Sequence, residues 1–86
     1  MPIVITERFA EAYIELPRHI QKKVDKALRL LDADFRHPSL RARHIEGTKG
    51  IYEARVDLKH RMTYEREGDR LIMRTVGEHD KTLARP

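Results

Sequence analysis

Residues 51–76 read IYEARVDLKHRMTYEREGDRLIMRTV, and the spacing of the apolar side chains in this stretch decides the fold. Apolar and polar residues alternate through IYEARVDL and again through RMTYE, which is typical of strands with one buried face. Gly68 and Asp69 then interrupt the pattern and suit a two-residue hairpin turn. LIMRTV is apolar on both faces apart from Arg74 and Thr75, as in a strand inside a sheet. The short links predict an antiparallel meander of three strands.

The alternation also divides the side chains between two faces of this sheet. We expect one face to bury Tyr52, Ala54, Val56, Leu58, Met62 and Tyr64. The opposite face then carries Glu53, Arg55 and Asp57 from one strand and Arg61 from its neighbour. Two arginines on adjacent strands are therefore predicted to share one surface.

The preceding residues have helical rather than alternating spacing. PIVI, residues 2–5, predicts a short strand, and Thr6 is suited to cap the helix that follows. Pro17 predicts the end of that helix and the start of another, because proline is tolerated in a first helical turn. The second helix has one apolar stripe, made by Ile20, Val24, Ala27, Leu28, Leu31 and Phe35. Residues 36–50 have no period and predict a long ordered loop, a kind of segment that often has a function.

These elements predict an α+β protein with the order β-α-α-β-β-β. The helical hairpin should pack on one face of a mainly antiparallel four-stranded sheet and leave the other face open. Eighty-six residues are enough for one core, so we expect residues 1–86 to form a single domain. The chain has no cysteine, no long apolar run and no basic, apolar leader, which predicts a cytoplasmic protein without disulfides or a membrane span.

The basic residues are concentrated in the second part of the chain. The formal net charge is +4, and residues 1–35 contribute nothing to it, because six Lys/Arg balance six Asp/Glu there. Residues 36–86 hold twelve Lys/Arg and eight Asp/Glu. A localised positive excess favours a polyanionic partner, with nucleic acid first. Lys22, Lys23 and Lys26 lie on the polar side of the second helix and are either a solvated surface or contacts to an RNA backbone.

Arginines on a rigid sheet, with a histidine nearby, are suited to phosphate chemistry. Arginine binds phosphate through two N–H groups at once, and histidine can give up a proton near neutral pH. RNA cleavage without a metal needs an acid for the leaving oxygen and cations for the charge on phosphorus. His79, between Glu78 and Asp80 just after the last strand, is the candidate acid. The alternative is a solvated charged surface in which Arg55 and Arg61 pair with neighbouring acids. No histidine pair has the spacing of a helical zinc site, and no cofactor is expected.

Residues 45–80, IEGTKGIYEARVDLKHRMTYEREGDRLIMRTVGEHD, resemble the RelE/ParE superfamily of toxins. The resemblance rests on an ordered series of motifs: the IEG turn, YEARV, HRMTY, Gly68–Asp69 and VGEHD. The two helices before them also fit that fold. The resemblance implies a RelE-like, ribosome-dependent mRNA endonuclease that uses no metal, has no cofactor, and is inhibited by a cognate antitoxin. VGEHD is closest to the YafQ-like group, in which a histidine at this place is a candidate general acid.

By motif position, the resemblance makes Arg61 the contact to the scissile phosphate, Arg55 a second catalytic cation and His79 the general acid. Glu53, His60 and Asp80 are candidates for supporting acid–base roles. The basic residues expected to contact RNA are Lys22, Lys23, Lys26, Arg41, Arg43, Lys49, Lys59 and Arg74.

The chain departs from the RelE pattern in two ways. Glu53 and Arg55 stand where RelE proteins have two lysines, and the chain ends at Pro86, so we expect it to lack the RelE C-terminal helix with its tyrosine. Two other functions are therefore also considered. One is a ParE-like protein that poisons DNA gyrase without cutting RNA. The other is a non-catalytic member that only binds an antitoxin or nucleic acid.

Overall fold

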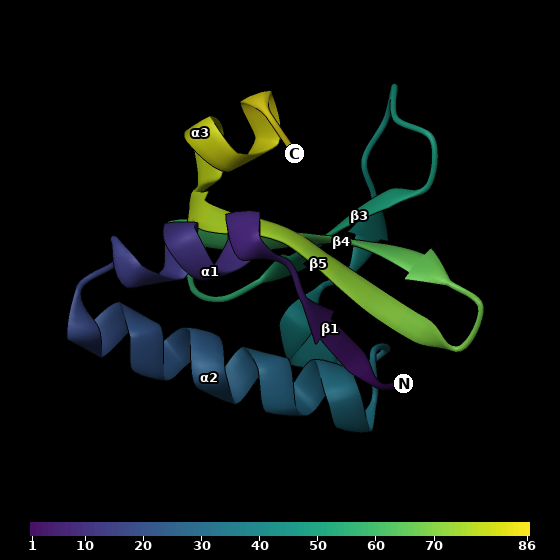
Figure 1. Cartoon of the computed structure of the whole chain (residues 1–86), viewed down its shortest axis with the longest axis horizontal. Coiled ribbons are helices and arrows are strands. Elements are labelled where there is room, and N and C mark those ends of the chain that lie inside the picture. Colours follow the sequence, from purple (N-terminus) through teal and green to yellow (C-terminus); the bar gives the residue numbers. More distant parts are fainter.

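The computed structural model describes residues 1–86 and confirms the predicted class, with helices on a mainly antiparallel sheet (Figure 1). The elements are β1 (Ile3–Ile5), α1 (Glu7–Ile14), α2 (Arg18–Ala33), the 3-10 helix η1 (Pro38–Leu40), β2 (Arg43–His44), β3 (Ile51–Arg55), β4 (His60–Glu67), β5 (Arg70–Glu78) and α3 (His79–Ala84). The strands are ordered β1-β5-β4-β3-β2. β1 pairs in parallel with β5, and every other pair is antiparallel.

The helical hairpin begins as the sequence predicts. The side chain of Thr6 accepts a hydrogen bond from the amide of Phe9 and donates one to the carbonyl of Met73, so it caps α1 and joins it to β5. Pro17 lies at the N-cap of α2. The hydroxyl of Tyr13 donates to Asp25 at 2.7 Å and links the two helices.

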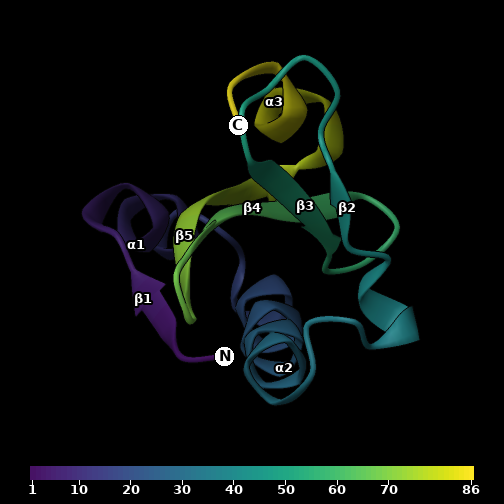
Figure 2. The ribbon, with the colours of Figure 1, turned by 90° about the vertical axis from the view of Figure 1, so that its right-hand side faces the viewer.

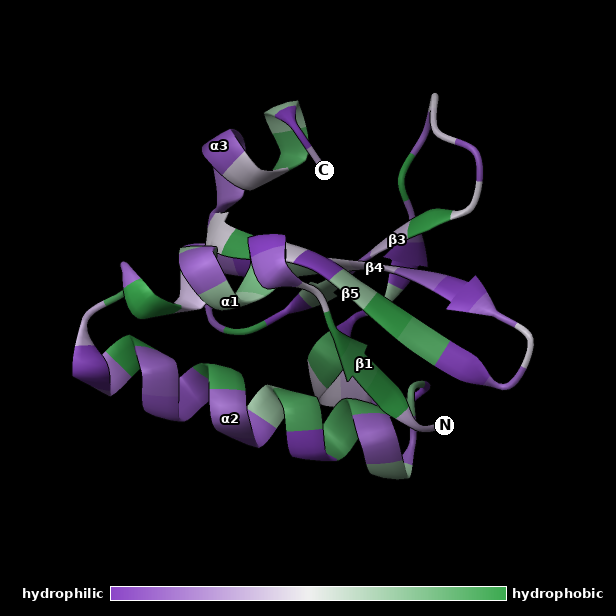
Figure 3. Cartoon of the chain, viewed as in Figure 1, coloured by the Kyte–Doolittle hydropathy of each residue, from purple (hydrophilic) through white to green (hydrophobic).

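The core lies between this hairpin and one face of the sheet. In Figure 2, α1 and α2 lie on one side of the sheet and α3 on the other. Figure 3 shows that β1 and the middle of β5 are hydrophobic, whereas the β4–β5 turn is hydrophilic. One cluster of twelve buried apolar residues fills the core: Phe9, Ile20, Val24, Ala27, Leu31, Leu40, Ala54, Met62, Tyr64, Leu71, Met73 and Val76.

The segment predicted as a loop contains two short elements that the sequence did not reveal. η1 lies within it, and β2 adds a fifth strand by pairing Arg43 with Glu53 and His44 with Tyr52. The prediction of four strands was therefore wrong by one. β2 has two residues, too few for alternation to be recognised.

The prediction for Leu58 was also wrong. β3 ends at Arg55, so residues 56–59 form a turn instead of continuing the strand. Leu58 lies on this turn and is 75% exposed. The bonding of Asp57 to the amides of Lys59 and His60 explains why the chain leaves the strand here, because a side chain that accepts amide hydrogens favours a turn.

We expected the second face of the sheet to be open. Instead, α3 covers part of it. The chain passes directly from β5 into this helix at His79. The sequence analysis did not predict a helix here, and the helix found, α3, has six residues and contains no tyrosine. The carbonyl of Pro86 accepts hydrogen bonds from Thr63 and Arg74 on the sheet. Thr82 of α3 is 5% exposed. α3 therefore packs on the sheet and holds the end of β5 in place.

Gly77 allows α3 to approach the sheet this closely. A Cβ atom at Gly77 would lie 3.0 Å from Oγ1 of Thr82, which is tighter than ordinary packing. We expect Gly77→Ala to displace α3 and to lower the free energy of unfolding by about 1–3 kcal/mol, as overpacking does. Urea unfolding of Gly77→Ala and of the Gly77→Ala/Thr82→Ala pair measures this effect.

The double variant is the control for Gly77→Ala, because alanine at residue 82 removes the atom that the new methyl group would meet. Gly77→Ala should therefore cost less in the Thr82→Ala background than in the wild type. An equal cost in both backgrounds would show that Gly77 matters for another reason.

Candidate active site

Arg61 lies at the start of β4 with its guanidinium group turned toward the β3–β4 turn. Its Nη1 donates to the carbonyl of Asp57 at 2.6 Å and to that of His60 at 3.0 Å. Its side chain is 16% exposed. Burial lowers the pKa of Arg61, and the neighbouring charge of Arg55 lowers it further. Nη2 takes part in none of these bonds, so the protein positions the guanidinium group and leaves one edge for an anion.

Glu53 lies beside Arg61 and is itself almost buried. Its side chain is 7% exposed, and Oε1 lies 3.4 Å from Nε of Arg43 and 3.8 Å from Nε of Arg61. β3 positions it, because Glu53 pairs with Arg43 of β2 on one side and with Thr63 of β4 on the other. The carboxylate of Glu53 is therefore held between two guanidinium groups.

These residues surround an open hollow of about 450 Å³, which we call the arginine hollow. Its lining residues are Arg41, Arg43, Glu53, Arg55, Leu58 and Arg61. Four of the six are arginines and one is an acid. Since Glu53 balances one of those charges, the hollow keeps a positive excess that suits a phosphate group.

His79 is the first residue of α3 and lies next to the same turn. Its backbone amide donates to the carbonyl of Lys59 at 2.7 Å, and its ring is 41% exposed. Nδ1 lies 3.0 Å from Oδ1 of Asp80. With Asp80 accepting from Nδ1–H, Nε2 of the protonated ring is the nitrogen that can give a proton to a bound group.

His79 lines a second open hollow of about 430 Å³, the histidine hollow, made by Leu58, Lys59, Arg61, Glu78, His79 and Asp80. Leu58 and Arg61 line both hollows. The structure therefore brings together two of the predicted catalytic residues, Arg61 and His79, and Arg55 lines the adjoining arginine hollow. The strand pattern predicted that Leu58 is buried. Leu58 is exposed instead, and it lines both hollows.

His60, the first residue of β4, lines neither hollow and instead contacts the turn before it. Its Nδ1 lies 2.9 Å from Oδ1 of Asp57, and its side chain is 12% exposed. The same carboxylate accepts from two backbone amides and lies 3.3 Å from Nζ of Lys23. Asp57 thus organises the turn that holds Arg61. The sequence analysis had assigned Asp57 only to the polar face of a strand, although its position two and three residues before the amides it binds is typical of such turns.

Asp57 should make stability depend on pH in the acid range. Burial would raise the pKa of Asp57, but the bonds from His60, from two backbone amides and from Lys23 outweigh it and lower the pKa from 3.8 to about 2. This stabilisation is present above the unfolded pKa and is lost as pH falls from 3.8 toward 2. We expect it to be worth about 2 kcal/mol.

The measurement is urea unfolding of wild type and Asp57→Asn at several pH values between about 2 and 6. Asp57→Asn should be less stable by about 2 kcal/mol at neutral pH and should lose less stability than wild type on acidification. Asp32→Asn, on the exposed side of α2, is the control. Parallel pH curves for wild type and Asp57→Asn would contradict the assignment.

The predicted RNA-contacting residues fall into four groups. Arg41 and Arg43 line the arginine hollow, and Lys59 lines the histidine hollow. Lys23 and Lys26 of α2 line a further hollow that also includes Arg55 and Asp57. The remaining three, Lys22, Lys49 and Arg74, lie outside these hollows. Arg74 pairs with Glu65 at 3.2 Å and donates to the carbonyl of Pro86, so its charge is already used within the protein.

No three His, Cys, Asp or Glu side chains lie together in an arrangement that could hold a metal ion. No helix of the chain has the length and apolar character needed to cross a membrane.

The fold is similar to that of solved YafQ, RelE and YoeB structures. A YafQ structure from E. coli strain BL21(DE3) aligns with a TM-score of 0.77 and 15% identity over 92% of this chain and 93% of that one. The RelB-RelE complex from Methanococcus jannaschii gives a TM-score of 0.75 and 20% identity, covering 91% and 92% of the two chains. A YoeB/ParE toxin from Agrobacterium tumefaciens gives 0.74 and 19%, covering 92% and 99%. No protein-family model and no curated protein matches the chain.

Proposed function

We propose that this chain is the toxin of a type II toxin–antitoxin system and cuts ribosome-bound mRNA in the cytoplasm. The observation that carries the proposal is the position of Arg61, which lines both the arginine hollow and the hollow of His79. A phosphate on the free edge of Arg61 would have Arg55 on one side and an exposed imidazole on the other. The RelE-like fold supports the proposal, because similar chains of this fold are named as toxins.

In this mechanism the 2′-oxygen of RNA attacks the adjacent phosphorus, and the bond from phosphorus to the 5′-oxygen breaks. Arg61 and Arg55 stabilise the extra negative charge that forms on the phosphate oxygens. His79 gives a proton to the leaving 5′-oxygen, and Asp80 keeps the ring oriented. Glu53 is the one carboxylate in the arginine hollow and is our candidate to accept the proton of the 2′-hydroxyl. The products are a cyclic phosphate and a free 5′-hydroxyl group.

We further propose that a cognate antitoxin binds the chain. Among the similar structures are complexes of a toxin with its antitoxin, such as the RelB-RelE complex from Methanococcus jannaschii and the RelBE complex from E. coli. The exposed arginines of the arginine hollow offer an acidic partner segment a surface of opposite charge.

The test is primer extension on an mRNA held in purified ribosomes. The protein is first treated with EDTA and freed of the chelator, so that the ribosomes keep their Mg²⁺. Discrete cuts within the codon of the A site are the expected result. Intact mRNA together with relaxed or cleaved plasmid DNA would contradict the proposal and favour a protein that poisons DNA gyrase. Intact mRNA and intact DNA would leave a non-catalytic binding protein.

A further inference from the structure

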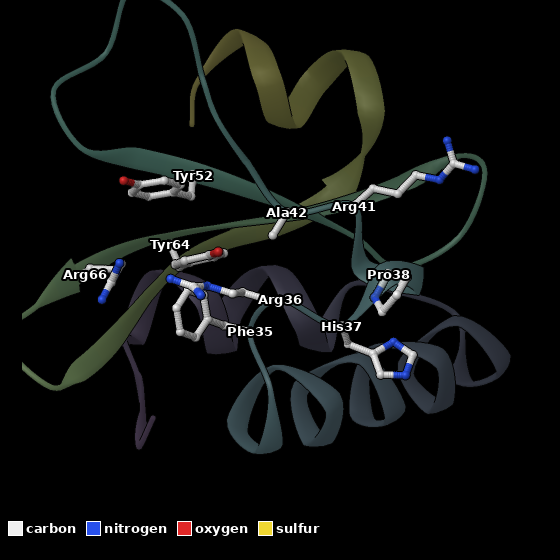
Figure 4. A pocket seen from close by; sticks show the side chains of 9 residues that line it. All are labelled: Phe35, Arg36, His37, Pro38, Arg41, Ala42, Tyr52, Tyr64 and Arg66. Atoms are coloured by element: carbon white, nitrogen blue, oxygen red, sulfur yellow. The ribbon is translucent and has the colours of Figure 1, made fainter.

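A fourth hollow, on the opposite side of Arg41 from the catalytic arginines, has aromatic walls. Phe35, Tyr52 and Tyr64 line it together with Arg36, Arg41 and Arg66, in a space of about 340 Å³ (Figure 4). We call it the aromatic hollow. None of its lining residues is an acid, so its charge is positive.

The rings and guanidinium groups of the aromatic hollow form stacked pairs. Tyr52 and Tyr64 lie with ring centroids 5.6 Å apart and planes inclined by 15°. The guanidinium groups of Arg66 and Arg36 lie 4.8 Å and 5.3 Å from the centre of the Phe35 ring. Flat aromatic and guanidinium surfaces beside arginines are the features on which proteins stack the bases of single-stranded nucleic acid.

Tyr64 has a polar group in this hollow that the protein does not use. The residue is 1% exposed, and its hydroxyl forms no hydrogen bond with the protein. Because no fully buried side-chain nitrogen or oxygen lacks a partner, this hydroxyl must keep a small accessible area. Figure 4 shows it directed to the side where Ala42 and Arg36 lie. Burial, followed by the nearby Tyr52, raises the pKa of Tyr64 to about 12, so the hydroxyl keeps its proton at neutral pH and can donate it.

Arg41 connects the aromatic hollow to the candidate active site. It lines both the aromatic and the arginine hollow, and in Figure 4 its side chain extends away from the aromatic rings. Its backbone has a φ of +46°, an uncommon conformation for a residue with a side chain. A nucleic acid strand with one phosphate at Arg61 could thus follow Arg41 into the aromatic hollow.

We propose that the aromatic hollow binds a base of the single-stranded RNA substrate, at a nucleotide away from the cleaved phosphate, because Tyr52 and Tyr64 lie on the opposite face of the sheet from Arg61. The base stacks against the aromatic wall and accepts a hydrogen bond from Tyr64, and Arg36 and Arg66 hold its phosphate. This inference rests on the proposed function and names a second contact to the same substrate.

The test measures the binding of short fluorescent 2′-O-methyl RNA, which cannot be cut through its 2′-oxygen. Tyr64→Phe should bind it about 3- to 10-fold more weakly, while the melting temperature stays the same, because the hydroxyl has no partner within the protein. Arg66→Gln should weaken binding by about fivefold or more. Arg70→Gln, which removes an equal charge from the nearby hairpin where Arg70 pairs with Glu67, is the matched control and should have a smaller effect.

An abasic series identifies the base that occupies the hollow. Removing one base at a time should reveal a position at which wild type and Tyr64→Phe bind equally. If Tyr64→Phe binds every RNA as wild type does, the inference fails, even where mRNA cleavage is observed. Conversely, the hollow can bind RNA in a protein that does not cleave mRNA, so the two proposals fail separately. If poly-glutamate shifts the NMR signals of the hollow and RNA does not, the occupant is an acidic protein segment and the inference is wrong.

Discussion

His79→Ala should slow mRNA cleavage by about 100- to 10,000-fold, the range that a general acid commonly contributes. The substitution removes the only imidazole that lines the histidine hollow and keeps the backbone bond between its amide and Lys59. We therefore expect the variant to fold normally and to bind ribosomes as wild type does. The measurement is a single-turnover cleavage rate on programmed ribosomes. His19→Ala, on the exposed side of α2, is the matched control and should keep the full rate.

The role of His79 as an acid has a sharper chemical test. An mRNA in which sulfur replaces the leaving 5′-oxygen needs no proton for the bond to break. The cleavage rate of His79→Ala should therefore return toward that of wild type on this substrate. A variant that cleaves ordinary mRNA at the wild-type rate would remove His79 from the mechanism. A variant that stays slow on the sulfur substrate would show that His79 acts in another way than as the acid.

The parts of the fold with strong periodicity could be predicted from the sequence. The stripe of α2 buries Ile20, Val24, Ala27 and Leu31, and Thr6 caps α1, as expected. These features depend on residues close together in the chain, so local spacing reveals them. β2 and α3 could not be predicted in this way. Both elements are short, and each is held by contacts to another part of the chain. β2 pairs with β3, and the residue after the C-cap of α3 bonds to the face of the sheet.

The candidate site shows the same division. Arg55 and Arg61 could be placed on neighbouring strands from alternation, and the structure pairs them across β3 and β4. That Arg61 would be held by carbonyls of the β3–β4 turn could not be predicted, because β3 ends earlier than its pattern suggests. The aromatic hollow was missed for a related reason. Tyr52 and Tyr64 were recognised only as core residues, and the opening beside them depends on the loop that carries Arg36 and Arg41.

Arg61→Lys should reduce the cleavage rate by about 100-fold or more, although the positive charge is kept. Nη1 of Arg61 is used for the carbonyls of Asp57 and His60, and Nη2 remains for the phosphate. One lysine ammonium cannot serve both positions, because it lacks the planar fork. Arg61→Ala should lose as much activity and should also melt at a lower temperature, since the two carbonyls lose their donor.

Activity and stability together separate the two roles of Arg61. Arg70→Lys makes the same chemical change at the hairpin between β4 and β5 and should leave both properties as in wild type. If Arg61→Lys lowers the melting temperature but keeps the cleavage rate, Arg61 only supports the turn, and Arg55 becomes the residue that binds the phosphate. If it lowers the rate and leaves the melting temperature unchanged, the free edge of the guanidinium group is what the reaction requires. The second result is expected, because a lysine can still reach the carbonyl of Asp57 while leaving the phosphate without its second donor.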